Sequence, residues 1–464
     1  MNRKIDYSSD YADRGAHIDG VKMQEIIIDS NSGISAGERS VFVNANIHIN
    51  TKVYFHADYS DSSEYELEFK NCVIQYGEEG TENSQLKFRT PVKLQFTDCT
   101  FICGSMGSDN ILSLFEAENS CKAEFSSCRF ESCKELLTSG GAFERYAEIS
   151  VRDCFYHNCG ENMLHISNRA GNVTICDCLI KNDSRTVNQN NGQSYMFDSF
   201  IRRNMFAVFN DSVATDFIAY NNVIINVGNK KTGCFEATAS GKNVIKCCTF
   251  IDSQSCISQV KNSENCLFVN CTDVIDDCAH IDSCCFEKCE NIVYDLPRDG
   301  YVKNSRFIGS RNSIINAENG QSLIFNCQFL GAEASDDESL FFYTDDKFDG
   351  EPHFIRHCVF DNISVDEGYI VDAKLNPNKS NATIARLRDC TFSNLRTRRS
   401  DEKVFHDILY YDFLLWKNEA VTAVDYEAFA DGLRDINGKC VPFVKAERLE
   451  ADSLGISVGA DLSY

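Results

Sequence analysis

The chain has 464 residues and a formal net charge of −24. That balance disfavours nucleic acid and anionic membranes as partners, because binding to phosphate requires clustered Lys and Arg. It also disfavours a strongly acidic polysaccharide as a substrate, unless the overall negative charge conceals a local basic groove.

The N-terminus shows no secretory signal, because no apolar segment follows its charged start at Arg3 and Lys4. No apolar run is long enough to span a bilayer. We therefore expect a cytoplasmic protein that does not associate with a membrane.

The 24 cysteines fit that expectation as buried, reduced thiols that pack as small apolar groups. Cys247, Cys248, Cys284, Cys285 and Cys289 are dense enough to raise a metal site as an alternative. No CxxC pair with a matching second pair accompanies them. We predict no metal and no cofactor.

The first regular element is expected at residues 41–49. Val41, Val43, Ala45, Ile47 and Ile49 alternate with Phe42 and polar residues, which is typical of a strand with one apolar face. Residues 1–38 precede it and are expected to cap the end of the fold.

A short motif with a turn residue, Cys, any residue and Phe in order then recurs in thirteen copies, of which eleven have the Cys and nine have the Phe. The residue before the Cys position is Asn71, Asp98, Ser127, Asp153, Asp177, Asn221, Cys247, Asn265, Ser283, Asn304, Asn326, His357 and Asp389. Eleven of these thirteen are Asn, Asp or Ser, which tolerate left-handed backbone geometry. Each copy therefore predicts a tight bend between two strands, and the bends are expected to form a hydrogen-bonded ladder.

The Cys and Phe positions lie two residues apart and point to the same side of a strand. We expect them to form two inward columns, and the burial of each Phe contributes about 1.5–3 kcal/mol before its entropy cost.

The spacing of the copies predicts the fold. Successive Cys positions are 18 to 44 residues apart, for example Cys248 to Cys266 and Cys178 to Asn222. A period of twenty-odd residues with short strands is typical of a parallel β-helix, whose coils stack about 4.8 Å apart. We predict an all-β solenoid of about 13 coils.

From these motifs the chain resembles the right-handed parallel β-helix superfamily, the pectate-lyase-like fold, over residues 40–464. The segment from Arg448 to Leu462 is similar to the closing loop of many bacterial β-helix proteins, although Leu454 and Gly455 replace the usual Pro-Ala. The resemblance implies the fold and no particular activity, because lyases, hydrolases, epimerases, adhesins and non-catalytic proteins share it.

Three segments depart from the regular spacing of the repeat. Residues 181–215 are either an insertion or a coil that has lost its Cys, and residues 331–351 are acidic. Residues 404–411 and 426–430 suggest short helices. We therefore divide the chain into an N-terminal cap (1–38), a β-helix (39–400) and a small irregular or helical C-terminal cap (401–464).

Catalytic candidates are few. Enzymes of this fold that cleave polysaccharides need paired carboxylates, or carboxylates that bind Ca²⁺ with an Arg or Lys as base. The formal candidates are Asp276, Asp277, Asp336, Asp337, Asp345 and Asp346, although Asp pairs in an acidic solenoid are more often solvated turns. The Gly-His-Gly and Arg-x-Lys signatures of the hydrolases are missing.

Two basic spots are candidates for binding a partner. Their residues are Arg202, Arg203, Lys230 and Lys231 in one case, and Arg398 and Arg399 near Arg396 in the other. His157 and His165 fall near expected turns, where packing or surface roles are the simpler interpretation.

Two functions remain open. The first is a non-catalytic scaffold that recognises another protein along its faces, because solenoids commonly serve as extended binding platforms. The alternative is a carbohydrate-active enzyme, namely a polysaccharide lyase, glycoside hydrolase or epimerase. The missing signatures favour the first, with a protein as the expected partner and a glycan as the second possibility.

Overall fold

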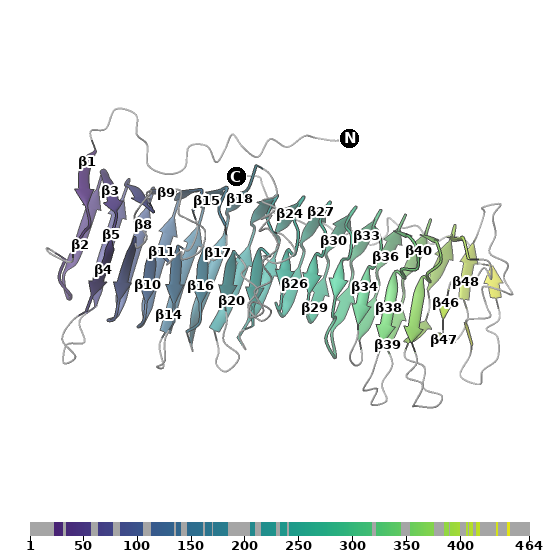
Figure 1. The fold of residues 1–464 in the computed structure, drawn as a ribbon. Helices are drawn as coiled ribbons and strands as arrows, with labels where there is room; N and C mark the ends of the chain where they lie inside the picture. Colours follow the sequence, from purple (N-terminus) through teal and green to yellow (C-terminus); the bar gives the residue numbers. More distant parts are fainter. Residues whose placement is uncertain are drawn as a thin grey trace. The chain divides into compact units, whose positions relative to one another are not determined.

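The computed structural model describes the chain in segments. They are residues 23–30, 34–56, 64–77, 84–104, 113–133, 136–140, 146–160, 163–168, 170–183, 205–208, 215–228, 233–238, 241–317, 322–344, 353–374, 385–388, 390–399, 405–406, 408–411, 414–417, 433–434 and 443–445. The chain forms two compact units, Met1–Asn243 (unit 1) and Val244–Tyr464 (unit 2). In the described segments every regular element is a β-strand (Figure 1).

In unit 1, successive coils contribute one strand each to three parallel sheets. Sheet A contains β1 (Gln24–Ile27), β3 (Ala45–Ile49), β6 (Val73–Tyr76), β9 (Thr100–Cys103), β12 (Arg129–Glu131), β15 (Phe155–His157), β18 (Leu179–Lys181) and β21 (Val223–Ile225). Sheet B contains β2 (Arg39–Val43), β5 (Tyr65–Lys70), β8 (Val92–Thr97), β11 (Cys121–Ser126), β14 (Tyr146–Arg152), β17 (Ala170–Cys176) and β20 (Thr215–Tyr220). Sheet C contains β4 (Lys52–Phe55), β7 (Gln85–Phe88), β10 (Phe115–Ala117), β13 (Leu137–Ser139), β16 (Leu164–Ile166), β19 (Phe206–Val208) and β22 (Phe235–Ala237).

Unit 2 repeats the three sheets and adds a fourth. Its sheet A contains β24 (Thr249–Ile251), β27 (Leu267–Val269), β30 (Cys285–Glu287), β33 (Arg306–Ile308), β36 (Gln328–Leu330), β40 (Val359–Asp361), β44 (Thr391–Ser393), β48 (Leu414–Lys417) and β50 (Phe443–Lys445). Its sheet B contains β23 (Asn243–Lys246), β26 (Asn262–Glu264), β29 (His280–Asp282), β32 (Tyr301–Lys303), β35 (Leu323–Phe325), β39 (His353–Arg356), β43 (Ala385–Arg388), β47 (Ile408–Tyr411) and β49 (Leu433–Arg434). Its sheet C contains β25 (Ile257–Ser258), β28 (Ile275–Asp276), β31 (Val293–Tyr294), β34 (Ile315–Ala317), β38 (Phe341–Thr344), β42 (Val371–Lys374) and β46 (Phe405–His406), and sheet D contains β37 (Glu333–Ala334), β41 (Ser364–Val365) and β45 (Arg396–Thr397).

Each strand pairs in parallel with the equivalent strand of the next coil, so the connections are crossovers, which are right-handed in proteins. The predicted right-handed parallel β-helix is confirmed.

The predicted bends account for the path from sheet B to sheet A. Of the thirteen residues that precede the Cys position, the twelve that the structure describes all have positive φ, between 50° and 59°. Their side chains form the expected ladder: Asn71 Nδ2 donates to Asn44 Oδ1 at 2.6 Å, and Asn326 Nδ2 donates to Asn304 Oδ1 at 2.9 Å. Asp389 lies outside the described residues.

Two inward columns follow each bend, as predicted. Phe250, Phe268, Phe286, Phe307 and Phe329 are fully buried, and neighbouring rings stack with centroids 4.7 to 4.9 Å apart. Offset stacking adds about 0.5–1.5 kcal/mol per pair to the burial of each ring. The Phe column is therefore a main source of the stability of unit 2.

The cysteines of the described residues are all free thiols, and nearly all are buried. Cys99 Sγ donates to the carbonyl oxygens of Thr97 and Phe69 at 3.3 and 3.4 Å. Burial raises the pKa of the Cys154 and Cys178 thiols well above the ordinary value, so these groups are neutral and unreactive.

One predicted strand is wrong. The segment 41–49 forms two strands, because Asn44 has a φ of 52° and makes a further copy of the bend. The bend reverses which residues face inward: Ala45, Ile47 and Ile49 are buried, whereas Val41 and Val43 are about half exposed, at 50% and 49%. Strand β1, from the expected N-terminal cap, pairs with β3 and adds a parallel strand to sheet A.

The predicted helix at 404–411 is also wrong, because β46 and β47 occupy this segment and pair with β42 and β43. The helix expected at 426–430 and the segment from Arg448 to Leu462 lie outside the described residues. The register shows that residues 181–215 belong to a single coil, because Leu179 pairs directly with Val223 and the chain between them supplies β19 and β20 to the other two sheets.

Candidate functional site

The site begins with two strands of sheet A in unit 1. In β12 and β15 the chain alternates, so that Phe130 and Tyr156 point into the core while Glu131 and His157 face outward. Glu131 and His157 are register partners, which places their side chains on adjacent coils about 4.8 Å apart.

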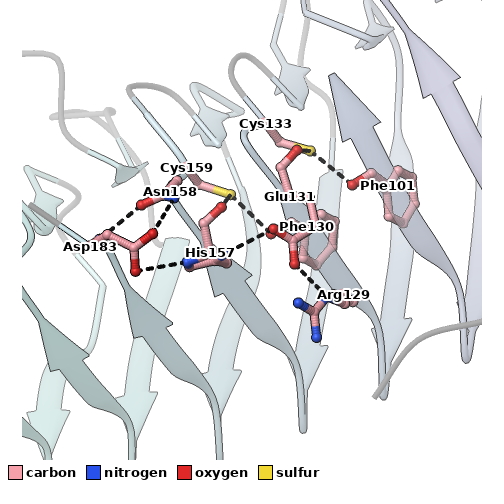
Figure 2. A network of polar contacts seen from close by, with 9 residues as sticks. All are labelled: Phe101, Arg129, Phe130, Glu131, Cys133, His157, Asn158, Cys159 and Asp183. Atoms are coloured by element: carbon pink, nitrogen blue, oxygen red, sulfur yellow. Dashed lines mark hydrogen bonds and ion pairs between the residues drawn. The ribbon is translucent and has the colours of Figure 1, made fainter. Parts of the chain in front are cut away.

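The centre of the site is the imidazole of His157, which lies between two carboxylates (Figure 2). Its Nδ1 is 2.8 Å from Oε2 of Glu131, and its Nε2 is 3.1 Å from Oδ1 of Asp183. Both ring nitrogens therefore have an anionic partner, an arrangement that favours the doubly protonated imidazolium, which donates at both nitrogens.

Arg129 extends the network on its other side. Its Nε donates to Oε1 of Glu131 in a short contact, and its guanidinium lies over the ring of Phe155, 4.9 Å from the centroid. The charges alternate along the network, from Arg129 through Glu131 and His157 to Asp183.

A bend orients the last carboxylate. Asn158 follows β15 with a φ of 53°, and its Nδ2 donates to Oδ2 of Asp183 at 3.0 Å. The backbone amide of Asp183 donates in return to Oδ1 of Asn158 at 2.9 Å. This reciprocal pair fixes Asp183 opposite His157 without contributing charge.

The network changes the protonation of its members. Partial burial lowers the pKa of His157, but the hydrogen bonds and charges of Asp183 and Glu131 raise it by more, so its pKa lies above the ordinary value. Hydrogen bonds from Asn158 and His157 hold the pKa of Asp183 below its usual range. The centre is thus a proton donor with an ionised acceptor beside it, and both reach solvent, with side chains 24% and 63% exposed.

The predicted acidic candidates lie elsewhere. Asp276 ends β28 and accepts a hydrogen bond from Ser258 Oγ at 3.3 Å, and Asp277 forms the bend that follows, with a φ of 51°. Asp336, also at positive φ, and Asp337 lie close enough to Glu338 to raise its pKa, after burial and together with Glu290. Asp345 and Asp346 lie outside the described residues.

Of the predicted basic candidates, too, only some lie within the described residues. Arg202, Arg203, Lys230 and Lys231 lie outside the described residues. Arg398 Nη1 forms an ion pair with Asp366 at 3.2 Å, and the guanidinium of Arg399 lies 4.1 Å from the ring centroid of Tyr369. Tyr369 stacks in turn on His406. This second spot is therefore partly neutralised.

Sequence reasoning named His157 but gave it a packing or surface role, and it missed Glu131 and Asp183, because the three residues are far apart in the chain. Glu131, His157 and Asp183 are each separated by 26 residues. A usable signal exists: Glu131 and His157 each stand three residues after a Cys of the repeat, at Cys128 and Cys154. Aligning the copies on their cysteines places both in one outward column.

Two further features of the described residues bear on the site. They contain no group of three or more His, Cys, Asp and Glu side chains arranged to hold a metal ion. They also include no helix long and apolar enough to cross a membrane.

Comparison with known proteins adds a structural likeness. No protein-family model matches the chain. No curated protein matches it either. Among solved structures, the chain is similar to one described as "Structural characterization of a mannuronic acid specific polysaccharide family 6 lyase enzyme from human gut microbiota", at 10% identity, over 92% of each chain and with a TM-score of 0.29. At this score the likeness says nothing of activity, and the conclusion that the chain is a parallel β-helix rests on its own strand pairing.

Proposed function

We propose that the protein is a carbohydrate-active enzyme whose proton donor is His157. The observation that carries the proposal is the position of this imidazole between Glu131 and Asp183, at 2.8 and 3.1 Å, on the outward face of a β-helix sheet. Lyases, hydrolases and epimerases of glycans all require a group that transfers a proton to or from the sugar.

The protonation states suit that step. His157 is held as the acid by its two carboxylate partners, and Asp183 is held as the base by Asn158 and His157. A pair of groups whose environments separate their pKa values is the usual arrangement for acid–base catalysis. A substrate hydroxyl or glycosidic oxygen would take the place of one carboxylate on the imidazole.

The surroundings suit a hydroxyl-rich ligand. Besides His157, the network offers the guanidinium of Arg129, the two carboxylates and the amide of Asn158. Such groups form hydrogen bonds with sugar hydroxyls, and the open sheet presents them in a row along successive coils, as an extended polymer requires. The alternative of a protein-binding scaffold is supported by a different surface in unit 2, described below.

The experiment is a cleavage assay on a panel of neutral and anionic polysaccharides. Purified protein is incubated with each polymer from pH 5 to 9, and the products are followed by reducing ends, ultraviolet absorbance of unsaturated ends and NMR of the sugar configuration. We expect at least one polymer to be shortened or epimerised. Folded protein that leaves every polymer unchanged would contradict the proposal.

A further inference from the structure

A separate surface lies on sheet B of unit 2, where three neighbouring strands expose an unusual set of side chains. In β32, β35 and β39 the inward residues Val302, Ile324 and Ile355 are fully buried. The partly exposed residues between them form two columns in register. We name these six residues the cationic–aromatic strip: Tyr301, Leu323 and Phe354 in one column, and Lys303, Phe325 and Arg356 in the other.

The two cations of the strip contact aromatic rings. Lys303 Nζ lies 3.7 Å from the ring centroid of Tyr301, and the guanidinium carbon of Arg356 lies 4.3 Å from that of Phe354. Arg356 Nε is buried and has no hydrogen-bond partner. A cation held against a ring has a neutral partner, so the pair stays positive, whereas a cation and a carboxylate form a pair with no net charge.

The acid beside the strip is engaged elsewhere. Asp282 is the register partner of Lys303, but its Oδ1 accepts hydrogen bonds from Ser283 Oγ and Asn304 Nδ2, at 3.0 and 2.9 Å. Burial, followed by the charges of Lys261 and Lys303, lowers the pKa of His280, which stacks on Tyr301 at 4.4 Å. Asp282 nevertheless keeps its charge: after burial, it and Glu264 raise the pKa of Tyr301. These two acids therefore border the strip on the side of β26 and β29, whereas Lys303 and Arg356 contact rings.

The same sheet in unit 1 provides a contrast. There Lys93 Nζ forms an ion pair with Glu66 at 2.7 Å, and Lys122 Nζ forms one with Glu148 at 3.0 Å. In this part of unit 1 the outward cations stabilise the stacking of the coils, and their charge is neutralised. The cations of the strip lack that role.

The next strand of the sheet, β43, adds two further arginines at positions in register with the strip. Strand β43 places Arg386 opposite Phe354 and Arg388 opposite Arg356. At the equivalent positions of β32, β35, β39 and β43 there are four cations and no Asp or Glu, in a chain with a net charge of −24.

We propose that the cationic–aromatic strip binds an acidic segment of a partner protein that also carries apolar side chains. Tyr, Phe and Arg are the residue types enriched at protein interfaces and their energetic hot spots. Positive charge on an otherwise acidic body attracts carboxylates and disfavours basic partners.

The composition distinguishes this occupant from two other classes of ligand. The strip has no carboxylate or amide side chain to bind a hydroxyl-rich glycan, and four of its six side chains are aromatic or aliphatic. A nucleic acid carries one charge per phosphate, so the net charge of the chain repels it more strongly than a short peptide with a few carboxylates among apolar residues. A segment of about four extended residues spans the four strands, about 14 Å.

The test uses a phage library that displays random dodecapeptides. Phage that bind the immobilised full-length chain are selected, and their peptides are sequenced. We expect enriched peptides to contain Asp or Glu together with Leu, Phe or Tyr. A synthetic copy of the selected peptide should bind at least tenfold more weakly to a chain carrying both Lys303→Ala and Arg356→Ala. The matched control carries Lys93→Ala and Lys122→Ala, on the same sheet in unit 1, and should bind like the wild type.

Three results would overturn the proposal. One is the absence of enrichment for acidic peptides, and the second is equal binding of the peptide to the strip variant, whose fold is checked by circular dichroism. The third is competition by a deoxythymidine oligonucleotide or a polyuronate that binds more tightly than the peptide through the same two residues. Because the strip and His157 are on different sheets of different units, failure here leaves the proposed enzymatic function untouched.

Discussion

The variant Phe286→Ala is expected to destabilise unit 2 by about 3–5 kcal/mol, the range typical of removing a buried aromatic ring from a packed core. Phe286 is fully buried and stacks on Phe268 at 4.8 Å and on Phe307 at 4.7 Å. The substitution removes the ring and both stacking contacts, and the rigid coils above and below leave little room for the cavity to collapse.

Urea unfolding followed by circular dichroism measures this loss, and hydrogen exchange locates it. In a solenoid each coil contacts only its neighbours, so faster exchange is expected first in β27, β30 and β33. The matched control is Tyr294→Ala, a ring in the same unit that is 52% exposed, and its effect should stay within about 0.5 kcal/mol. A loss below about 1 kcal/mol for Phe286→Ala would show that the Phe column is not a main source of stability.

The variant His157→Gln is expected to lower kcat on the cleaved glycan by about 100- to 10,000-fold, the usual contribution of a general acid or base. Glutamine retains a hydrogen-bonding side chain between Glu131 and Asp183 but carries no transferable proton. KM should change little, because the groups that bind the sugar remain.

The control for this variant is another His–carboxylate pair in sheet A of unit 1. His48 Nε2 lies 3.1 Å from Glu25 Oε2, and His48→Gln should leave kcat unchanged. Equal kcat in the wild type and His157→Gln would remove His157 from the mechanism, and equal losses in both variants would indicate a general effect of outward histidines on the fold.

The sequence predicted the backbone where the physical requirement is local. A bend with positive φ selects Asn, Asp or Ser at one position, so it could be found residue by residue, as at Asn71 and Asn326. The same rule applied to Asn44 would have divided the segment 41–49 correctly. A second bend, four residues after several of the cysteines, was missed at Ser132 and Asn158 because the same rule was not applied there.

The sequence predicted less where the outcome depends on distant residues. The segment 404–411 has an apolar pattern that a helix and a buried strand share, and pairing with β42 and β43 decides for the strand. The candidate site depends on the exact coil length, because a shift of one residue in register would turn His157 into the core. Single acidic pairs in the sequence, such as Asp276 and Asp277, contain no information about that register.

In the proposed reaction protonated His157 donates the proton, and the decisive measurement is the pH profile of kcat in the wild type and in Glu131→Gln. Glu131 raises the pKa of His157, so the imidazolium persists above the ordinary pKa of about 6.5, and activity should fall only as the pH rises through the higher folded value. Removing the charge of Glu131 lowers that pKa, so the basic limb should move to lower pH, while Glu25→Gln, beside His48, leaves it in place. A basic limb that stays at the same pH in Glu131→Gln would contradict the account.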